Sequence, residues 1–220
     1  VHLYTYYSKI YNNLQVYFLF YISMVKTNSL NIEIGTSLPN FDLINANSLN
    51  NEKFSFSDLD NRHLFLMFIC AHCPFVKHLE KQITELYMDF KENVQIIAIS
   101  SNDINTHPAD SPENLRNQAK KNNWHFPYLF DEDQSFAKTL KAACTPDFYI
   151  FSNKGNSNFS LFYHGQLDDS RPSNNIPVTG MDLRAAVKAL NEGLTYNRQQ
   201  IPSLGCNIKW TPGKEPDWFN

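Results

Sequence analysis

The chain has 220 residues, of which 42% are hydrophobic and 14% aromatic, and its formal net charge is −3. This composition is sufficient for a sizeable hydrophobic core and excludes a low-complexity or disordered chain. The basic residues form no stripe along the sequence, so nucleic-acid binding is not expected.

Residues 1–33 are predicted to be an N-terminal extension outside the folded domain, either disordered or preceding the true start. Three interpretations of residues 1–23 stay open: an over-extended start before Met24, a secretory signal or membrane anchor, and an ordinary mobile tail. The apolar run Val16–Ile22 is shorter than the ~20 residues that a membrane-spanning helix needs, and it has no small-residue cleavage site. A cytoplasmic location is therefore expected, with export or membrane tethering as the alternative if residues 1–23 are a genuine signal or anchor.

The first predicted elements form an N-terminal β-hairpin. A turn at Gly35–Pro39 leads into a short strand at Phe41–Leu43, and Asn45–Asn51 has the composition of a second turn. Phe54–Ser57 then alternates apolar and polar residues, which is typical of a half-buried strand.

A strand, a helix and a second strand follow. His63–Ile69 is a continuous apolar run of strand length, which indicates a central strand covered on both faces. Apolar residues then recur at three- and four-residue steps, at Val76, Leu79, Ile83, Leu86 and Phe90. This spacing predicts an amphipathic helix that starts near Cys73, with Pro74 in its first turn. Val94–Ile99 is the next buried strand and completes a right-handed βαβ unit.

The second half of the chain is predicted to add a helical insertion, further strands and a final helix. Asp110 and Glu113 are placed as a capping pair for a helix through about Lys121. The remaining elements are a short strand at Phe126–Phe130, a helix at Gln134–Lys141, strands at Asp147–Phe151 and Phe159–Tyr163, and a helix at Met181–Asn191. Residues 34–194 thus form an α/β domain with a central mixed sheet flanked by helices, and residues 195–220 form a C-terminal tail that wraps it.

The pair Cys70 and Cys73 lies where the buried strand meets the helix, and a C-x-x-C pair in this setting indicates redox chemistry. The first turn of a helix has free N–H groups and the positive end of the dipole, which stabilise a thiolate. Cys70 is expected to be the more exposed, attacking thiol, and Cys73 the thiol that resolves the mixed disulfide. His72 either adds positive charge beside the thiolate or is a solvent-exposed residue without a tuning role.

Thr145 and Pro146 are the second signal. A proline that enters a strand, as Pro146 does, predicts a cis peptide bond in a tight turn. With the dithiol upstream, we expect this turn to face the two cysteines and to support their chemistry.

The other two cysteines, Cys144 and Cys206, are candidate additional redox thiols. Cys144 is either a third redox thiol or a small buried hydrophobic residue. Cys206 is expected to pair with Cys144, to resolve an oxidised Cys73, or to be a packed free thiol. A zinc site usually needs a second close pair of ligands, so neither a metal nor another cofactor is expected.

Five spaced motifs resemble those of the peroxiredoxin-like (AhpC/TSA-type redoxin) branch of the thioredoxin superfamily. They are Phe68–His78, Ser101–Asp103, Ala143–Phe148, Leu167–Pro172 and Gly205–Trp210. The resemblance covers about residues 34–213 and implies a thioredoxin-like fold with an N-terminal hairpin and a thiol redox activity. In such folds the proline at the position of Pro146 faces the dithiol and helps to shape the substrate groove.

The chain departs from the peroxiredoxin pattern of Pro, three residues, Thr, two residues, Cys. Cys73 occupies the peroxidatic position, but Cys70 replaces the Thr and Leu66 replaces the Pro. Without the Thr hydroxyl, a peroxide has lost a hydrogen-bond partner. We therefore expect a thiol–disulfide oxidoreductase that uses Cys70–Cys73 on protein or small-molecule disulfides, with a thiol electron donor. The alternatives are a thiol peroxidase that uses Cys73 and a non-catalytic metal-binding or redox-sensing module.

Overall fold

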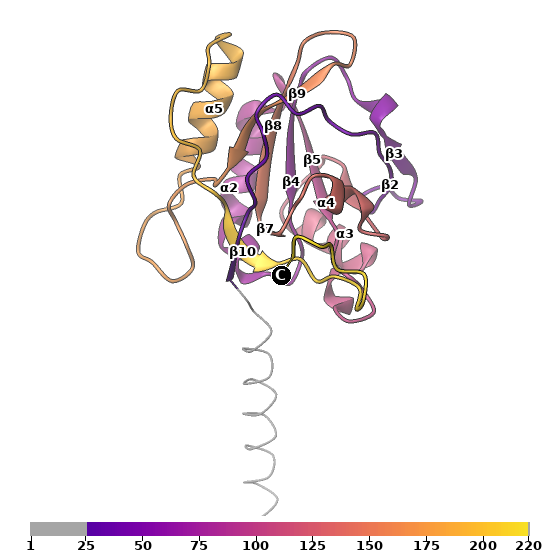
Figure 1. Ribbon diagram of the computed structural model, residues 1–220. Helices are drawn as coiled ribbons and strands as arrows, with labels where there is room; N and C mark the ends of the chain where they lie inside the picture. The colour runs from indigo at the N-terminus through magenta and orange to yellow at the C-terminus, as the bar shows by residue number, and fades with distance from the viewer. Residues whose placement is uncertain (1–25, 220) are drawn as a thin grey trace, which may run out of the picture.

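The structure is a computed structural model that describes residues 26–219 (Figure 1). Its strands are β1 (Lys26–Asn28), β2 (Asp42–Asn45), β3 (Lys53–Ser55), β4 (His63–Phe68), β5 (Val94–Ser100), β6 (Tyr128–Phe130), β7 (Cys144–Thr145), β8 (Asp147–Asn153), β9 (Phe159–Gly165) and β10 (Leu204–Asn207). Its helices are α2 (Pro74–Phe90), α3 (Pro112–Lys121), α4 (Ser135–Thr139) and α5 (Met181–Asn191), with short 3-10 turns η1 (Phe56–Asp58) and η2 (Pro108–Asp110). The interpretations of residues 1–23 lie outside the described residues.

A seven-stranded mixed sheet forms the centre of the fold, in the order β3-β2-β6-β5-β4-β8-β9. Strand β4 pairs in parallel with β5 and antiparallel with β8, and α2 is the crossover between β4 and β5. Strands β2 and β3 form the predicted hairpin at one edge. The expected α/β architecture with a central mixed sheet is confirmed.

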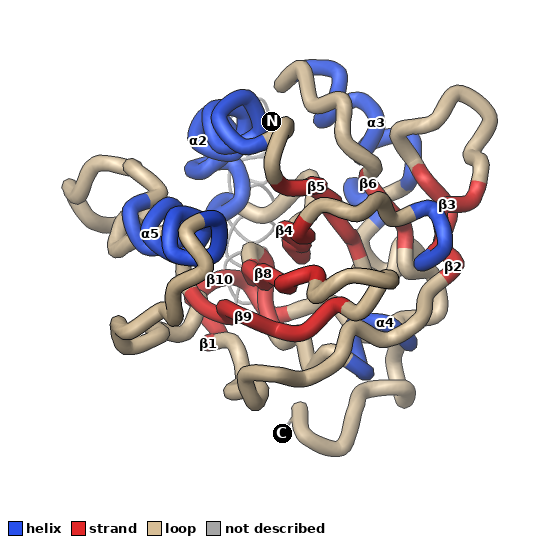
Figure 2. Tube along the Cα trace, turned by 90° about the horizontal axis from the view of Figure 1, so that it is seen from above, coloured by secondary structure: helices blue, strands red, loops and turns tan. Residues whose placement is uncertain are grey.

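The apolar run of β4 is buried on both faces of the sheet, as its continuous hydrophobic pattern predicts. Phe65 and Met67 belong to the cluster that packs under α2, α3 and α5. Leu64, Leu66 and Phe68 alternate with them and belong to the cluster that contains residues of α4. Figure 2 shows α2 and α5 on one side of the sheet and α4 on the other. Among residues 26–219, no helix is long and apolar enough to cross a bilayer.

A second sheet of three short strands joins the two ends of the described chain. Its order is β1-β10-β7, and in its register Lys26 lies opposite Cys206 and Cys206 lies opposite Thr145. Figure 1 shows the indigo β1 beside the yellow β10. The expected extension over residues 1–33 is therefore corrected, because residues 26–28 pair with the main body of the fold.

The tail after α5 is attached to the sheet by more than β10. Ile208 is fully buried and Trp210 almost so, and both belong to the cluster on the α4 side. Trp218 and Phe219 pack edge-on against Trp210. The carbonyl of Lys209 accepts hydrogen bonds from the backbone N–H of Asp103 and from the side chain of Gln134.

Gly205 allows an unusually close approach between β10 and β7. A Cβ atom at this position would lie 2.0 Å from the carbonyl oxygen of Thr145 and 3.0 Å from the nitrogen of Pro146. These neighbours are backbone atoms, which cannot rotate away as a side chain can. The absence of a side chain at Gly205 therefore sets how near β10 lies to the turn before β8.

We expect Gly205→Ala to lower the free energy of unfolding by about 1–3 kcal/mol, because the added methyl group overpacks a backbone contact. Thermal unfolding followed by circular dichroism measures the effect. Leu49→Ala is the control, since Leu49 is 93% exposed and its truncation should leave the midpoint unchanged. Equal midpoints for the two variants would contradict the close approach.

Candidate active site

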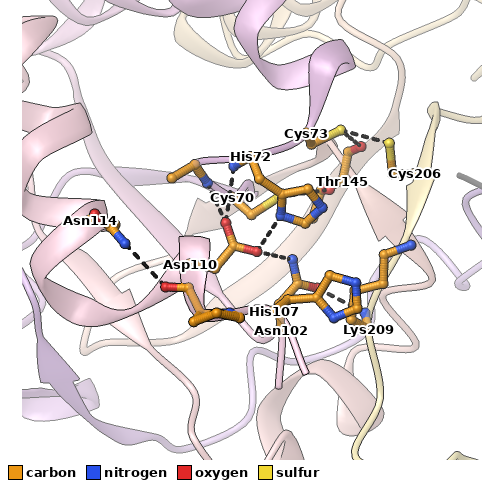
Figure 3. Close-up of polar contacts among 12 residues, drawn as sticks. Cys70, His72, Cys73, Asn102, His107, Asp110, Asn114, Thr145, Cys206 and Lys209 are labelled. Atoms are coloured by element: carbon orange, nitrogen blue, oxygen red, sulfur yellow. Dashed lines mark hydrogen bonds and ion pairs between the residues drawn. The ribbon is translucent and has the colours of Figure 1, made fainter. Parts of the chain in front are cut away.

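Cys70 and Cys73 lie side by side at the carboxyl end of β4 (Figure 3). Cys70 follows the strand, and Cys73 is the N-cap residue of α2, whose first position is Pro74. The helix start therefore agrees with the sequence prediction. The prediction that Cys70 is the more exposed thiol is wrong, because both side chains have 0% exposed surface.

Cys73 is the thiol that the structure makes acidic. Burial by itself would raise its pKa, but hydrogen bonds from the thiols of Cys206 and Cys70 and from the backbone N–H of Val76 lower the pKa well below its usual value. Its Sγ lies 3.0 Å from Sγ of Cys206 and 3.2 Å from the carbonyl oxygen of Thr145. A cap position at a helix N-terminus is also where a thiolate is stabilised by the dipole.

Cys70 has the opposite character. Burial raises its pKa well above the usual value, and its hydrogen bond to Cys73 and the negative charge of Asp110 raise it further. The hydroxyl of Thr145, 3.4 Å from Sγ of Cys70, opposes this shift. The structure therefore favours Cys73 over Cys70 as the thiolate, which reverses the roles expected from the sequence.

The buried carboxylate of Asp110 organises the loop between the two cysteines. Its Oδ1 accepts hydrogen bonds from the backbone N–H groups of Ala71 (2.8 Å) and His72 (3.0 Å), and its Oδ2 accepts one from Nδ2 of Asn102 (2.8 Å). Oδ2 also bonds Nδ1 of His72. Burial would raise the pKa of Asp110, but the contacts with His72 and Asn102 hold it below its usual value.

The prediction that Asp110 caps the helical insertion is wrong. The N-cap of α3 is Ser111, whose hydroxyl accepts from the backbone N–H of Asn114, and Pro112 takes the first helical position. A serine directly before a proline is a common helix start, so the sequence did contain the signal for Ser111.

His72 lies beside both Cys70 and Asp110, and its tuning role stays a prediction. Its side chain is 21% exposed, its Nδ1 bonds Asp110, and the same nitrogen lies 3.8 Å from Sγ of Cys70. Its ring also stacks on that of His107, with 5.4 Å between the centroids. Any positive charge on His72 is therefore paired with a carboxylate and only secondarily faces the thiol.

The turn at Thr145 and Pro146 contacts both cysteines. The peptide bond between them is cis, which confirms the sequence prediction. The Thr145 side chain reaches Cys70 and its carbonyl oxygen reaches Cys73, so one residue bridges the dithiol.

Of the two other cysteines, the structure brings Cys206 to the dithiol. Cys206 lies opposite Thr145 in the small sheet, so the two side chains share a face, whereas Cys144 is the neighbour of Thr145 and faces the other way. The thiol of Cys144 donates to the carbonyl oxygen of Pro146 at 3.6 Å, and burial raises its pKa.

Three side-chain atoms, from Cys70, His72 and Asp110, lie within 4.8 Å of one another, close enough to hold a metal ion. Sulfur, imidazole nitrogen and carboxylate oxygen are all ligands that zinc accepts. Here, however, His72 and Asp110 bond each other, so an ion would have to break that contact to bind.

Asn102 and Lys209 lie in two of the motifs that carry the resemblance, but sequence reasoning gave them no role at the site. Oδ1 of Asn102 accepts the backbone N–H of Lys209 at 2.8 Å while its Nδ2 donates to Asp110. The available signal was position, since Asn102 follows β5 as Cys70 follows β4. The carboxyl ends of parallel strands meet at one edge of a sheet, where sites of α/β folds form.

The AhpC/TSA family matches residues 34–157. An uncharacterized conserved protein from Geobacillus kaustophilus is 44% identical, with 86% of this chain and 98% of that chain covered and a TM-score of 0.80. A hypothetical protein from Sinorhizobium meliloti is 39% identical, with 85% and 100% covered and a TM-score of 0.79.

A more distant structure, described as a candidate thiol:disulfide interchange protein DsbE from Chlorobium tepidum, shows the fold alone. It is 15% identical, with 73% of this chain and 99% of that chain covered and a TM-score of 0.54. No curated protein matches the chain. The thioredoxin-like fold is confirmed, and with it the thiol-based redox character that the cysteine cluster indicates. The chain belongs to the AhpC/TSA family of thioredoxin-like redoxins.

Proposed function

We propose that this protein is a thiol–disulfide oxidoreductase in which Cys73 attacks the substrate disulfide and Cys70 resolves the intermediate. The observation that carries the proposal is the difference in surroundings between two adjacent thiols, a helix N-terminus at Cys73 and a buried carboxylate near Cys70. Cys73 caps α2 and its pKa is lowered, whereas Cys70 lies beside the carboxylate of Asp110 and its pKa is raised, so ionisation of Cys73 is favoured over that of Cys70. Dithiol exchange requires these two roles, an attacking thiolate and a second thiol that resolves the mixed disulfide.

The reaction proceeds in two exchanges. The Cys73 thiolate attacks one sulfur of a disulfide R–S–S–R′, forms the mixed disulfide Cys73–S–S–R and releases R′S⁻. The Cys70 thiol then gives its proton to R′S⁻ and attacks Sγ of Cys73, which forms the Cys70–Cys73 disulfide and expels RS⁻. A thiol donor reduces this disulfide and completes the cycle.

The burial of the cysteines favours small-molecule disulfides as substrates. Neither sulfur has exposed surface, so any disulfide needs the site to open, and a folded protein needs a larger opening than a small molecule. A short disulfide compound needs only a local movement of the side chains that cover the site, of which His72 is partly exposed.

We expect Cys73→Ser to reduce the first-turnover release of thiol from glutathione disulfide to the background rate, because it removes the attacking sulfur. Cys70→Ser should keep this first release but form no Cys70–Cys73 disulfide. Cys144→Ser is the control, with unchanged rates. Full first-turnover activity in Cys73→Ser would disprove the assignment of the attacking thiol.

We expect Asp110→Asn to lower the pKa of Cys70, because the negative charge that raises it is removed. Each unit by which the pKa falls increases the thiolate fraction about tenfold on the acid side. The rate of mixed-disulfide resolution, measured against pH in a Cys206→Ser background, should therefore rise at neutral pH and its midpoint should move down. Glu113→Gln, a change of an exposed carboxylate on α3, is the control. An unchanged midpoint in Asp110→Asn would show that its charge does not govern Cys70.

A thiol peroxidase is the second candidate, because Cys73 has a lowered pKa and occupies the peroxidatic position of the peroxiredoxin pattern. Its thiolate would attack hydrogen peroxide, take one oxygen as a sulfenic acid and release hydroxide. This candidate predicts peroxide consumption that depends on added thiol and disappears in Cys73→Ser. Peroxide consumption equal in the wild type and Cys73→Ser would remove it.

A further inference from the structure

Cys206 places a third sulfur in contact with the attacking one. Its side chain is 1% exposed, and its Sγ lies 3.0 Å from Sγ of Cys73 (Figure 3). That separation is about one ångström longer than the ~2.05 Å of a disulfide bond, so a small rotation of either side chain brings the two sulfurs together.

The strand that carries Cys206 is fixed in place on both sides of it. Before it, Gly205 lies against the carbonyl group of Thr145 with no room for a side chain. After it, the backbone N–H of Ile208 donates to the carbonyl of Ala143, and that of Lys209 donates to Asn102. Backbone contacts on both sides of Cys206 therefore fix its position.

We propose that Cys206 is a third reacting sulfur of this site, a second resolving thiol that forms a disulfide with Cys73. The inference deepens the proposed function and rests on it. The mixed disulfide at Cys73 then has two thiols in reach, Cys70 from the loop after β4 and Cys206 from β10.

The alternative step balances in the same way as the first. After Cys73 has formed the mixed disulfide with R, the thiol of Cys206 gives its proton to the released R′S⁻. Its sulfur attacks Sγ of Cys73, a Cys73–Cys206 bond forms, the Cys73–S–R bond breaks, and RS⁻ leaves with the electron pair. Two protein thiols are oxidised and one external disulfide is reduced.

The surroundings of Cys206 favour its ionisation once Cys73 is in a mixed disulfide. In the reduced protein its pKa is raised chiefly by the hydrogen bond that it shares with Cys73 and next by burial, while the charge of Lys209 lowers it. The first of these causes disappears once Cys73 is in a disulfide. Cys70 also loses its hydrogen bond to Cys73, but burial and the negative charge of Asp110 continue to raise its pKa.

The test treats the full chain with glutathione disulfide, alkylates the free thiols and maps every disulfide by mass spectrometry. We expect Cys70→Ser to form the Cys73–Cys206 disulfide and to release glutathione. The double variant Cys70→Ser/Cys206→Ser should instead retain glutathione on Cys73, at least about tenfold more than the single variant if resolution by Cys206 lowers the barrier by ~1.4 kcal/mol. Cys70→Ser/Cys144→Ser is the matched control and should behave as Cys70→Ser.

The two proposals fail in different ways. Equal retention of glutathione on Cys73 in Cys70→Ser and in the double variant, with Cys206 found alkylated in Cys70→Ser, would overturn the role of Cys206 and leave the proposed function intact. No glutathione on Cys73 in the double variant would overturn the proposed function itself.

A variant that keeps all four cysteines checks the placement of the strand. We expect Gly205→Ala to move β10 away from Thr145. The variant should therefore form less of the Cys73–Cys206 disulfide than the wild type, while the yield of Cys70–Cys73 stays the same. If the Cys73–Cys206 disulfide is absent from both the wild-type protein and Cys70→Ser, the inference is overturned.

Discussion

The buried carboxylate of Asp110 holds together three segments that lie far apart in the sequence. It binds the backbone of the loop after β4, the amide of Asn102 after β5, and through that amide the tail at Lys209. A buried charge is tolerated only where hydrogen bonds surround it, and here both oxygens are used. The geometry of the cysteine cluster depends on these contacts, because they fix the loop on one side and the covering tail on the other.

The two cysteines of the C-x-x-C pair differ because their surroundings differ. The N–H groups of Ala71 and His72, which a thiolate at Cys70 would need, are bound to Asp110. Cys73 lies at the start of α2 and receives its hydrogen bonds from thiols and from the first turn of the helix. A carboxylate beside one sulfur and a helix N-terminus beside the other thus assign the proton to Cys70.

The sequence predicted the elements whose patterns are long. The apolar run of β4 and the helical spacing of α2 located the dithiol, and the proline at 146 located the cis turn. The small sheet was missed because its strands have two to four residues without alternation, and their pairing joins opposite ends of the chain. Asp110 was misassigned because an acidic residue before a helix has the same local pattern whether it caps that helix or binds another loop. The acidity of the two thiols depends on these tertiary contacts, so spacing could not predict it.

Within residues 26–219, strand β1 is the outer strand of the small sheet and pairs with β10. Its first residue, Lys26, lies directly opposite Cys206. The backbone that enters the domain is therefore hydrogen-bonded to the strand that carries the third sulfur. The pairing of Lys26–Asn28 with residues 204–206 therefore helps to hold the strand that places Cys206 beside Cys73.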